Sequence, residues 1–213
     1  VAFIDDLGHY LPGDFIGCLV RQVVLPRPAG ATIVRRQLHG YALDETVAQA
    51  GGQTVVSKVG WPFIKATMRE HGAIYGSEPS GHHYYRDFAF QESSMYTIAL
   101  VLFAIASSGK SLAQLTAPLF ADYHSIDEES FPLPSTEAIE TVYQKLTAAL
   151  PEGQVERFDG LSIAGADWHL NLRPSGGEPL LRFNLEARSR AALEAVYAKV
   201  KSVLPAVQAS DKN

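Results

Sequence analysis

Residues 168–186, WHLNLRPSGGEPLLRFNLE, form two runs of alternating apolar and polar side chains around a glycine-rich turn. In the first run the polar side chains are those of His169, Asn171 and Arg173. A period of two places one set of side chains on each face of a strand, as in an antiparallel sheet with one buried face. The apolar set is Trp168, Leu170, Leu172, Leu181, Phe183 and Leu185. The stretch therefore predicts a β-hairpin that faces a core.

Helical patterns flank this hairpin. Apolar residues recur at helical spacing within 139–150 and again within 193–204. Short runs at 155–158 and 162–163 predict two further strands. We therefore expect an α+β domain at 124–213, a small antiparallel sheet covered on one side by two helices, as in the TATA-binding-protein-like fold. The tail after Pro205 is expected to fray.

The first half of the chain alternates strands and helices instead. The expected strands are 32–34, 54–56 and 73–75, and the expected helices are 14–24, 43–50 and 62–71. This order is typical of an α/β domain with a mixed, mostly parallel sheet and flanking helices, which we place at 8–123. Such sheets bind ligands at the carboxyl ends of their strands, and the loop from Gly76 follows one of those ends.

Two more helices and a linker complete the expected organisation. Residues 93–108 are apolar on nearly every side, which predicts a buried helix that ends at Gly109. Ser111 and Gln114 form a capping-box pattern for a following helix. Acidic and prolyl residues cluster at 122–134, which predicts a linker between the two domains.

The first residues, Val1 to Ile4, read as a buried strand without a lead-in and without an initiator Met. A buried strand at residue 1 suggests a chain cut from something longer. We keep this as a hypothesis, to be tested by a mass measurement against the full coding frame.

Composition narrows the function classes. The 213 residues are 46% hydrophobic and 19% charged, with a net charge of −5, which is typical of a globular protein and disfavours nucleic acid as a partner. The longest apolar run, about 98–106, is too short to span a membrane, so none is expected as a partner. The single cysteine, Cys18, has apolar neighbours and predicts a core thiol, which fits a cytoplasmic location.

The loop from Gly76 to His82 carries groups suited to a sugar. Glu78 supplies an acceptor and Ser80 a hydroxyl that both donates and accepts, which a sugar diol requires. Glycines on either side let the backbone approach a ligand. The alternative from residue types alone is an ordinary surface loop.

The turn of the hairpin carries groups suited to a phosphate. Arg173 points away from the core, and Ser175, Gly176 and Gly177 follow it. A guanidinium with a hydroxyl and backbone N–H groups binds phosphate well. The alternative is a glycine-rich hairpin with a solvated arginine.

Metal and nucleophile signals are weak. The seven histidines include no helical i, i+4 pair, and His82 and His83 would point opposite ways on an extended segment, so we expect no metal site. No Ser–His–Asp set can be recognised from spacing, because such groups meet only in space.

At these loops the chain resembles the α-D-phosphohexomutases, the phosphomannomutase/phosphoglucomutase family. The family's sugar loop, Gly-Glu-x-Ser-Gly/Ala-His, is similar to Ser77-Glu78-Pro79-Ser80-Gly81-His82. Its phosphate loop, Arg-x-Ser-Asn/Gly-Thr-Glu-Pro, is similar to residues 173–179. Lys58-Val59-Gly60 also matches, and the resemblance runs from about Val1 to Leu204.

The resemblance implies the end of the family's second domain at 1–7, its third domain at 8–123 and its fourth at 124–213. The phosphoserine loop and the Mg²⁺ loop of the family belong to its first two domains, which this chain lacks. The implied activity is an isomerase that moves phosphoryl between O6 and O1 of a hexose through a phosphoserine and a hexose 1,6-bisphosphate, with Mg²⁺ in the intact enzyme. The chain alone is expected to be inactive, with no catalytic residue or metal ligand of its own.

By resemblance, Glu78, Ser80, His82, Lys58 and Trp61 would contact the sugar of mannose or glucose 1- or 6-phosphate, and Arg173, Ser175, Gly176 and Gly177 would hold the phosphate that is not transferred. Three positions depart from the family. Gly177 replaces a usual Thr, Trp61 a usual His, and Leu38 a usual basic residue for which Arg35 or Arg36 could substitute.

These departures keep a second hypothesis open, a non-catalytic sugar-phosphate-binding or regulatory protein on a mutase scaffold. A third, a nucleic-acid module built on the α+β domain, has little support from a net charge of −5.

Overall fold

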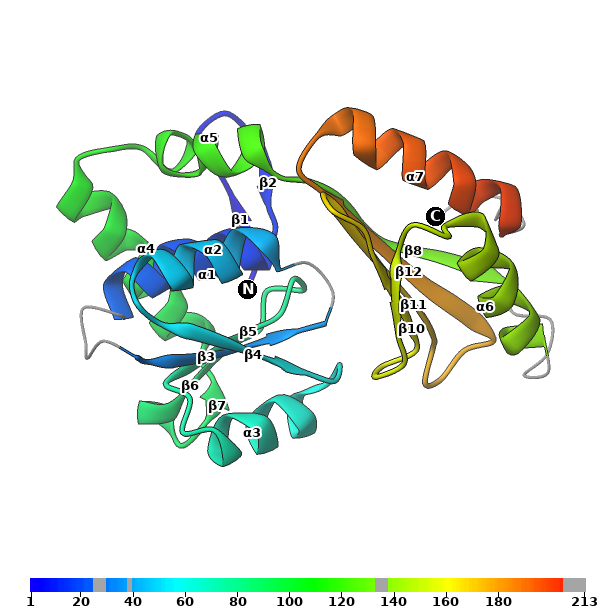
Figure 1. The fold of residues 1–213 in the computed structure, drawn as a ribbon. Coiled ribbons are helices and arrows are strands. Elements are labelled where there is room, and N and C mark those ends of the chain that lie inside the picture. The colour runs from blue at the N-terminus through cyan, green and yellow to red at the C-terminus, as the bar shows by residue number, and fades with distance from the viewer. Residues whose placement is uncertain (25–29, 38–39, 133–137, 205–213) are drawn as a thin grey trace. The chain divides into compact units, whose positions relative to one another are not determined.

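The computed structural model describes residues 1–24, 30–37, 40–132 and 138–204. The chain divides into two compact units, Val1–Ala121 (unit 1) and Asp122–Asn213 (unit 2), coloured from blue to green and from green to red in Figure 1. Each unit has its own sheet, and each is described separately below.

Unit 1 is built on a five-stranded sheet in the order β4-β3-β5-β6-β7. Its strands are β3 (Thr32–Arg36), β4 (Gln53–Ser57), β5 (Tyr75–Ser77), β6 (His83–Tyr85) and β7 (Gln91–Glu92). β3 pairs in parallel with both β4 and β5, whereas β6 and β7 run antiparallel. The predicted mixed, mostly parallel sheet is therefore confirmed for this unit.

Helices cover both faces of this sheet. They are α1 (Gly13–Val24), α2 (Tyr41–Gln49), α3 (Trp61–Glu70), α4 (Ser94–Ser108) and α5 (Leu112–Asp122). α1 contacts α2, α4 and β5, while α3 lies on the other face against β3 and β4 (Figure 1). Ile64 and Met68 of α3 meet Val34 and Tyr84 in a buried cluster on that face.

The helix ends follow local signals in the sequence. The Ser93 hydroxyl accepts a bond from the Tyr96 N–H at the start of α4, and Gly109 ends that helix with φ +67°. At α5 the Ser111 hydroxyl accepts from Gln114 N–H while the Gln114 side chain accepts from Ser111 N–H. This capping box was predicted from the residue types alone.

Three expectations for the chain are wrong in detail. The expected buried strand at Val1 is β1 (Phe3–Ile4), paired only with β2 (Tyr10–Leu11), and Ile4 is exposed. α4 is not fully buried, since Met95 is 76% exposed and both Leu102 and Phe103 face solvent. The expected linker is largely β8 (His124–Pro132), an edge strand whose charged side chains suit an unpaired edge.

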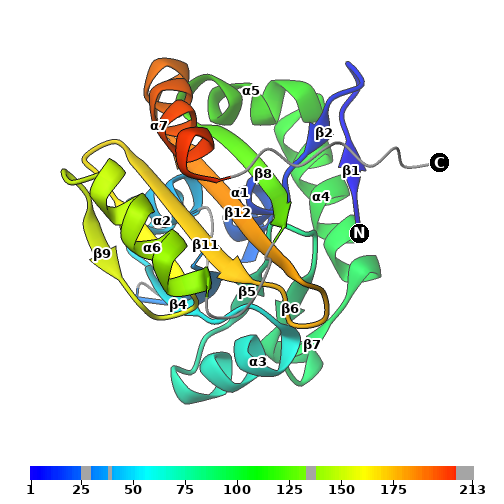
Figure 2. The same ribbon diagram turned by 90° about the vertical axis from the view of Figure 1, so that its right-hand side faces the viewer.

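Unit 2 contains a five-stranded, fully antiparallel sheet in the order β8-β12-β11-β10-β9. The other strands are β9 (Gln154–Glu156), β10 (Leu161–Ala164), β11 (Trp168–Pro174) and β12 (Leu180–Ala187). α6 (Ala138–Ala149) and α7 (Arg190–Val203) contact each other and lie across one face, as Figure 2 shows. The predicted hairpin is present. In it Leu172 lies opposite Phe183 and Leu170 opposite Leu185, and these four side chains are fully buried.

No single helix among the described residues has the length and apolarity to cross a membrane. α4 and α5 meet the criterion only as a pair, with a 98° bend between them.

Candidate functional site

The carboxyl ends of the three parallel strands of unit 1 carry most of the predicted sugar-binding residues. β3 ends at Arg36, β4 leads into Lys58, and β5 leads into Glu78. Parallel pairing places these three ends on one edge of the sheet, with neighbouring strands about 4.8 Å apart. This edge is where ligands bind in open α/β sheets.

The loop between β5 and β6 is a tight turn held by its own backbone. Glu78 N–H donates to His82 O at 3.0 Å, and Gly81 N–H donates to Glu78 O at 2.9 Å. Gly81 has φ +83°, and a Cβ there would lie 2.1 Å from Val1 O. Only glycine fits such a position without moving backbone.

The same loop rests on the first turn of α1. Gly13 N–H donates to Pro79 O at 3.0 Å, and a Cβ at residue 13 would lie 2.2 Å from Glu78 O. The shape of the loop therefore depends on Gly81, which lies in the predicted loop, and on Gly13, which sequence reasoning missed. Gly13 was missed because it is 65 residues from Glu78 in the chain.

Glu78 is buried beneath the turn, at 5% exposure. Its Oε2 accepts a hydrogen bond from the Tyr84 hydroxyl at 2.9 Å, and its Oε1 lies 3.6 Å from Arg36 Nε. Burial, and then the nearby Glu78 carboxylate, raise the pKa of Tyr84, so this phenol remains a donor. Glu78 is thus a fixed acceptor with two partners already in place.

Ser80 and His82 are the exposed members of the turn. The Ser80 hydroxyl lies 3.0 Å from His82 Nδ1, and the same ring nitrogen is 3.6 Å from Glu78 Oε2. The three side chains predicted to bind sugar hydroxyls are therefore neighbours, with Glu78 on the protein side and the other two on the solvent side.

His83 lies behind the loop and has a different character. It is fully buried, and its Nδ1 is 2.6 Å from the Tyr75 hydroxyl. Burial lowers the pKa of His83 to about 3, so the ring is neutral at physiological pH. His82 and His83 thus face different surroundings, as expected for adjacent residues of an extended segment.

Arg35 and Arg36 take separate roles. Arg35 donates two hydrogen bonds of 2.6 Å to the carboxylate of Asp44 in α2, which fixes it in the scaffold. Arg36 lies beside Glu78. Sequence reasoning left either arginine as a substitute for the usual basic residue near Leu38, and the structure brings Arg36 to the sugar loop. Leu38 itself falls outside the described residues.

Lys58 and Trp61 lie at the β4 end of the same edge, and both are exposed. Trp61 starts α3 with 62% of its surface exposed, and the Lys65 ammonium lies 4.9 Å from its ring centroid. The Trp61 ring is therefore largely outside the core, and the Lys65 ammonium lies over one of its faces.

The predicted phosphate loop joins β11 and β12 in unit 2. Its ends are closed by a bond from Ser175 N–H to Leu180 O at 2.8 Å. Arg173 Nη2 donates to Glu128 of β8 at 3.2 Å. Gly176 and Gly177 have no positive φ, and a Cβ on either would meet no described atom within 4 Å. Steric crowding therefore does not explain the two glycines. A requirement for backbone N–H groups that an anion can reach would explain them.

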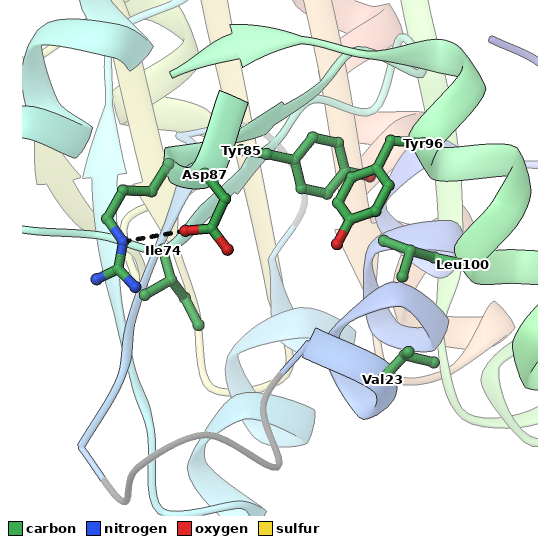
Figure 3. A pocket seen from close by; sticks show the side chains of 7 residues that line it. Val23, Ile74, Tyr85, Asp87, Tyr96 and Leu100 are labelled. Carbon is green, nitrogen blue, oxygen red and sulfur yellow. Dashed lines mark ion pairs between the residues drawn. The ribbon is translucent and has the colours of Figure 1, made fainter. Parts of the chain in front are cut away.

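A cavity of about 180 Å³ in unit 1 lies away from these loops (Figure 3). It is lined by Ile74, which precedes β5, and by Tyr85, at the end of β6, so it faces the amino end of β5. An ion pair of Arg86 and Asp87, 3.6 Å apart, lies at its side. The sugar loop follows the opposite end of β5, so this cavity is separate from the candidate site.

Metal ligands are not grouped in the described part of the chain. No cluster of three or more His, Cys, Asp or Glu side chains there could hold a metal ion.

Comparison with known proteins adds an independent line of evidence. A family model, described as phosphoglucomutase/phosphomannomutase, alpha/beta/alpha domain III, matches residues 12–123, which are more than half of the chain. The chain belongs to the phosphoglucomutase/phosphomannomutase family. The C-terminal domain of this family matches residues 135–203.

Relatives within the phosphoglucomutase/phosphomannomutase family are longer proteins. A phosphomannomutase of Salmonella montevideo is 36% identical over 201 residues, which cover 94% of this chain and 43% of the relative. A phosphomannomutase of Escherichia coli K12 is 37% identical over 185 residues, covering 86% and 40%. The chain thus spans about two fifths of the length of these relatives.

Two solved structures share the fold of this chain. A family protein of Burkholderia thailandensis matches with a TM-score of 0.75 at 25% identity, over 96% of this chain and 46% of that one. An N-acetylphosphoglucosamine mutase of Aspergillus fumigatus, in complex with glucose 1,6-bisphosphate, matches with a TM-score of 0.60 at 16% identity, over 95% and 45%. The second match supports the fold alone.

Proposed function

We propose that this chain is the part of a phosphohexomutase that recognises the sugar and the non-transferred phosphate of a hexose phosphate. The observation that carries the proposal is the turn at 78–82, where a buried carboxylate held by Tyr84 and Arg36 adjoins an exposed hydroxyl and imidazole. An oriented acceptor beside a group that both donates and accepts is suited to vicinal sugar hydroxyls.

In this proposal the residues of unit 1 bind the sugar ring. Glu78 accepts from a sugar hydroxyl while Ser80 and His82 complete the hydrogen bonds. Lys58 and Trp61, exposed on the same edge, contribute a charge and a stacking face. Because a phosphohexomutase must bind its sugar in two orientations, an acceptor and a hydroxyl serve better than groups specific to one hydroxyl.

The residues of unit 2 bind the phosphate. Arg173, Ser175 and the N–H groups of Gly176 and Gly177 hold the phosphoryl group that is not transferred. Binding energy at this remote group positions the sugar for the chemical step. The relatives named above are phosphomannomutases, so we propose mannose or glucose 1- or 6-phosphate as substrate.

Phosphoryl transfer itself requires groups that we place elsewhere in the intact protein, namely a phosphoserine and Mg²⁺. The chain alone is therefore proposed to bind hexose phosphate without turning it over.

Calorimetric titration with mannose 1-phosphate and glucose 1-phosphate tests this proposal. Arg173→Ala should weaken binding at least tenfold, because a charge-assisted contact of about 1.5–3 kcal/mol is lost. Arg157→Ala is the matched control, since Arg157 pairs with Glu140 on an exposed surface. Equal affinity of Arg173→Ala and the unaltered chain would remove the phosphate site from the proposal.

The second candidate, a non-catalytic binding protein, is favoured by two observations at departing positions. Trp61 stands exposed where the family usually has His, and Gly177 provides no hydroxyl. The two candidates differ in the intact protein supplied with Mg²⁺ and hexose 1,6-bisphosphate. Turnover of mannose 1-phosphate supports the mutase, and binding without turnover supports the alternative.

A further inference from the structure

The outer face of α4 is apolar and open to solvent. Met95 is 76% exposed, and Leu102 and Phe103 are each 59% exposed. The opposite face of the helix is buried and packs against α1, where Leu100 lines the same cavity as Val23 (Figure 3). One face of α4 therefore anchors the helix in unit 1, and the other presents large apolar side chains with nothing over them among the described residues.

This composition is unusual for a solvated helix face. α7, a helix of similar length, has the charged residues Glu194, Lys199 and Lys201 at exposed positions. α4 has no charged residue between Ser94 and Ser108. A surface helix normally places charged and polar side chains on its solvent side, and a contiguous exposed apolar patch marks an interaction surface. The outer face of α4 therefore has the character of a helix that packs against a partner.

The exposed residues have the spacing of a helix–helix contact. Met95, Ala99, Leu102 and Ala106 are all exposed, and they follow one another at intervals of four, three and four residues. This alternation keeps one line of side chains facing a neighbouring helix. We call these four residues the α4 seam. Large and small side chains alternate along it.

The α4 seam is complementary to a copy of itself that runs in the opposite direction. A two-fold axis at the level of residues 100 and 101 sets Met95 against Ala106 of the second copy, and Leu102 against Ala99 of the second copy. Each large side chain then meets a small one, as close helix packing requires. A parallel pair would instead set each residue of the α4 seam against its own equivalent, large against large and small against small.

The charges that flank α4 favour the same antiparallel arrangement. Glu92 precedes the helix and Lys110 follows it, and both residues are exposed. Antiparallel packing brings the Glu92 end of each copy to the Lys110 end of the other, so opposite charges meet at both ends of the contact. Parallel packing would bring like charges together, which disfavours association.

We propose that this chain forms a two-fold symmetric dimer in which the α4 seam packs antiparallel against the α4 seam of a second copy. Phe103 lies beside the seam and widens the apolar contact. Met and aromatic side chains are enriched in protein interfaces. Because a contact between two helix faces is small, we expect a dimer Kd of about 10 μM. The inference does not depend on hexose phosphate binding.

Sedimentation velocity of the chain between about 1 and 100 μM tests the proposal, and the sedimentation coefficient should rise from that of a monomer to that of a dimer. Leu102→Glu places two carboxylates at the centre of the contact and should raise the dimer Kd at least about tenfold. Leu7→Glu is the matched control, because Leu7 is 70% exposed in the turn between β1 and β2. Its Kd should stay within about twofold of that of the unaltered chain.

A charge exchange tests the direction of packing. Glu92→Lys and Lys110→Glu should each raise the dimer Kd about three- to tenfold, because each variant places like charges at both ends of an antiparallel contact. The double variant with both substitutions restores the opposite charges, so its Kd should return to within about twofold of that of the unaltered chain. A parallel dimer gives no such rescue.

Each outcome supports or overturns the inference. A chain that stays monomeric overturns it and assigns the α4 seam to a different partner, such as the remainder of the intact protein. A dimer whose Kd is the same in Leu102→Glu forms through another surface, which also overturns the inference. A dimer that the double variant does not rescue is not antiparallel. Should Leu102→Glu lose its helical circular dichroism, the two exposed charge variants outside α4 carry the test.

Discussion

The sugar loop of unit 1 and the phosphate loop of unit 2 are built on opposite principles. At 78–82 the backbone is fixed by glycines that no other residue could replace, and the carboxylate of Glu78 is buried. At 173–179 the glycines have free space around them among the described residues, and the charged side chains are partly exposed. The difference teaches that the backbone of the first loop is held in a rigid frame, whereas the second loop carries its charges on an uncrowded turn.

The largest predicted difference between the two loops is the cost in stability of replacing a glycine. Gly13→Ala places a Cβ 2.2 Å from Glu78 O, so we expect a loss of about 3 kcal/mol in the unfolding free energy of unit 1. Gly177→Ala is the matched change in unit 2 and should cost less than about 0.5 kcal/mol, because no described atom lies within 4 Å of its Cβ. Denaturant unfolding monitored separately in each unit measures both, and equal costs would contradict the contrast in rigidity.

The second prediction concerns pH and the buried side of the sugar loop. Burial lowers the pKa of His83 to about 3, below its ordinary 6.5, so the unfolded chain binds a proton at a higher pH than the folded one. Stability from this group is complete above about pH 6.5 and is lost as pH falls toward 3, by about 1.4 kcal/mol per pH unit.

Unfolding of unit 1 at pH 7, 6 and 5 measures this slope. His83→Phe should flatten it, and His82→Phe, at an exposed position of the same loop, should leave it intact. A slope that survives in His83→Phe would assign the effect to another group.

The smallest predicted effect is a gain in phosphate affinity at the 173–179 loop. Gly177→Thr restores the hydroxyl usual in the family, and the position has room for it. One added neutral hydrogen bond is worth about 0.5–1.5 kcal/mol, so phosphate affinity should rise about two- to tenfold. Gly177→Val, with the same shape and no hydroxyl, is the control in the same titration. An equal gain in both variants would point to backbone restriction rather than to a hydroxyl contact.

Much of the fold was predictable because local signals agreed with tertiary structure. The period-two pattern of 168–186 is the β11–β12 hairpin, and the capping box predicted at Ser111 stands at the start of α5. β8 was missed because an edge strand tolerates acidic and prolyl residues that otherwise indicate a linker. The exposure of α4 was missed because a helix apolar on every side has no polar face to mark the solvent.

The candidate site was predictable as two loops, but not as sets of contacts. Residue types made Glu78 and Arg173 candidates, whereas their partners Tyr84, Arg36 and Glu128 lie on other strands and meet them only in the folded chain. The position of Arg36 could be predicted in part. Adjacent residues of a strand point to opposite faces, so Arg35 and Arg36 had to lie on opposite faces of the sheet. Nothing in the local sequence of Glu128 indicated that it would accept a hydrogen bond from Arg173.

The division of labour between the loops is tested most directly by one NMR titration of the unaltered chain with inorganic phosphate and then with mannose 1-phosphate. The account predicts that inorganic phosphate shifts the amides of 173–179 and leaves those of 76–82 in place. Mannose 1-phosphate should shift both sets with a single Kd. Shifts confined to 173–179 with the sugar phosphate, or no response at either loop, would contradict it.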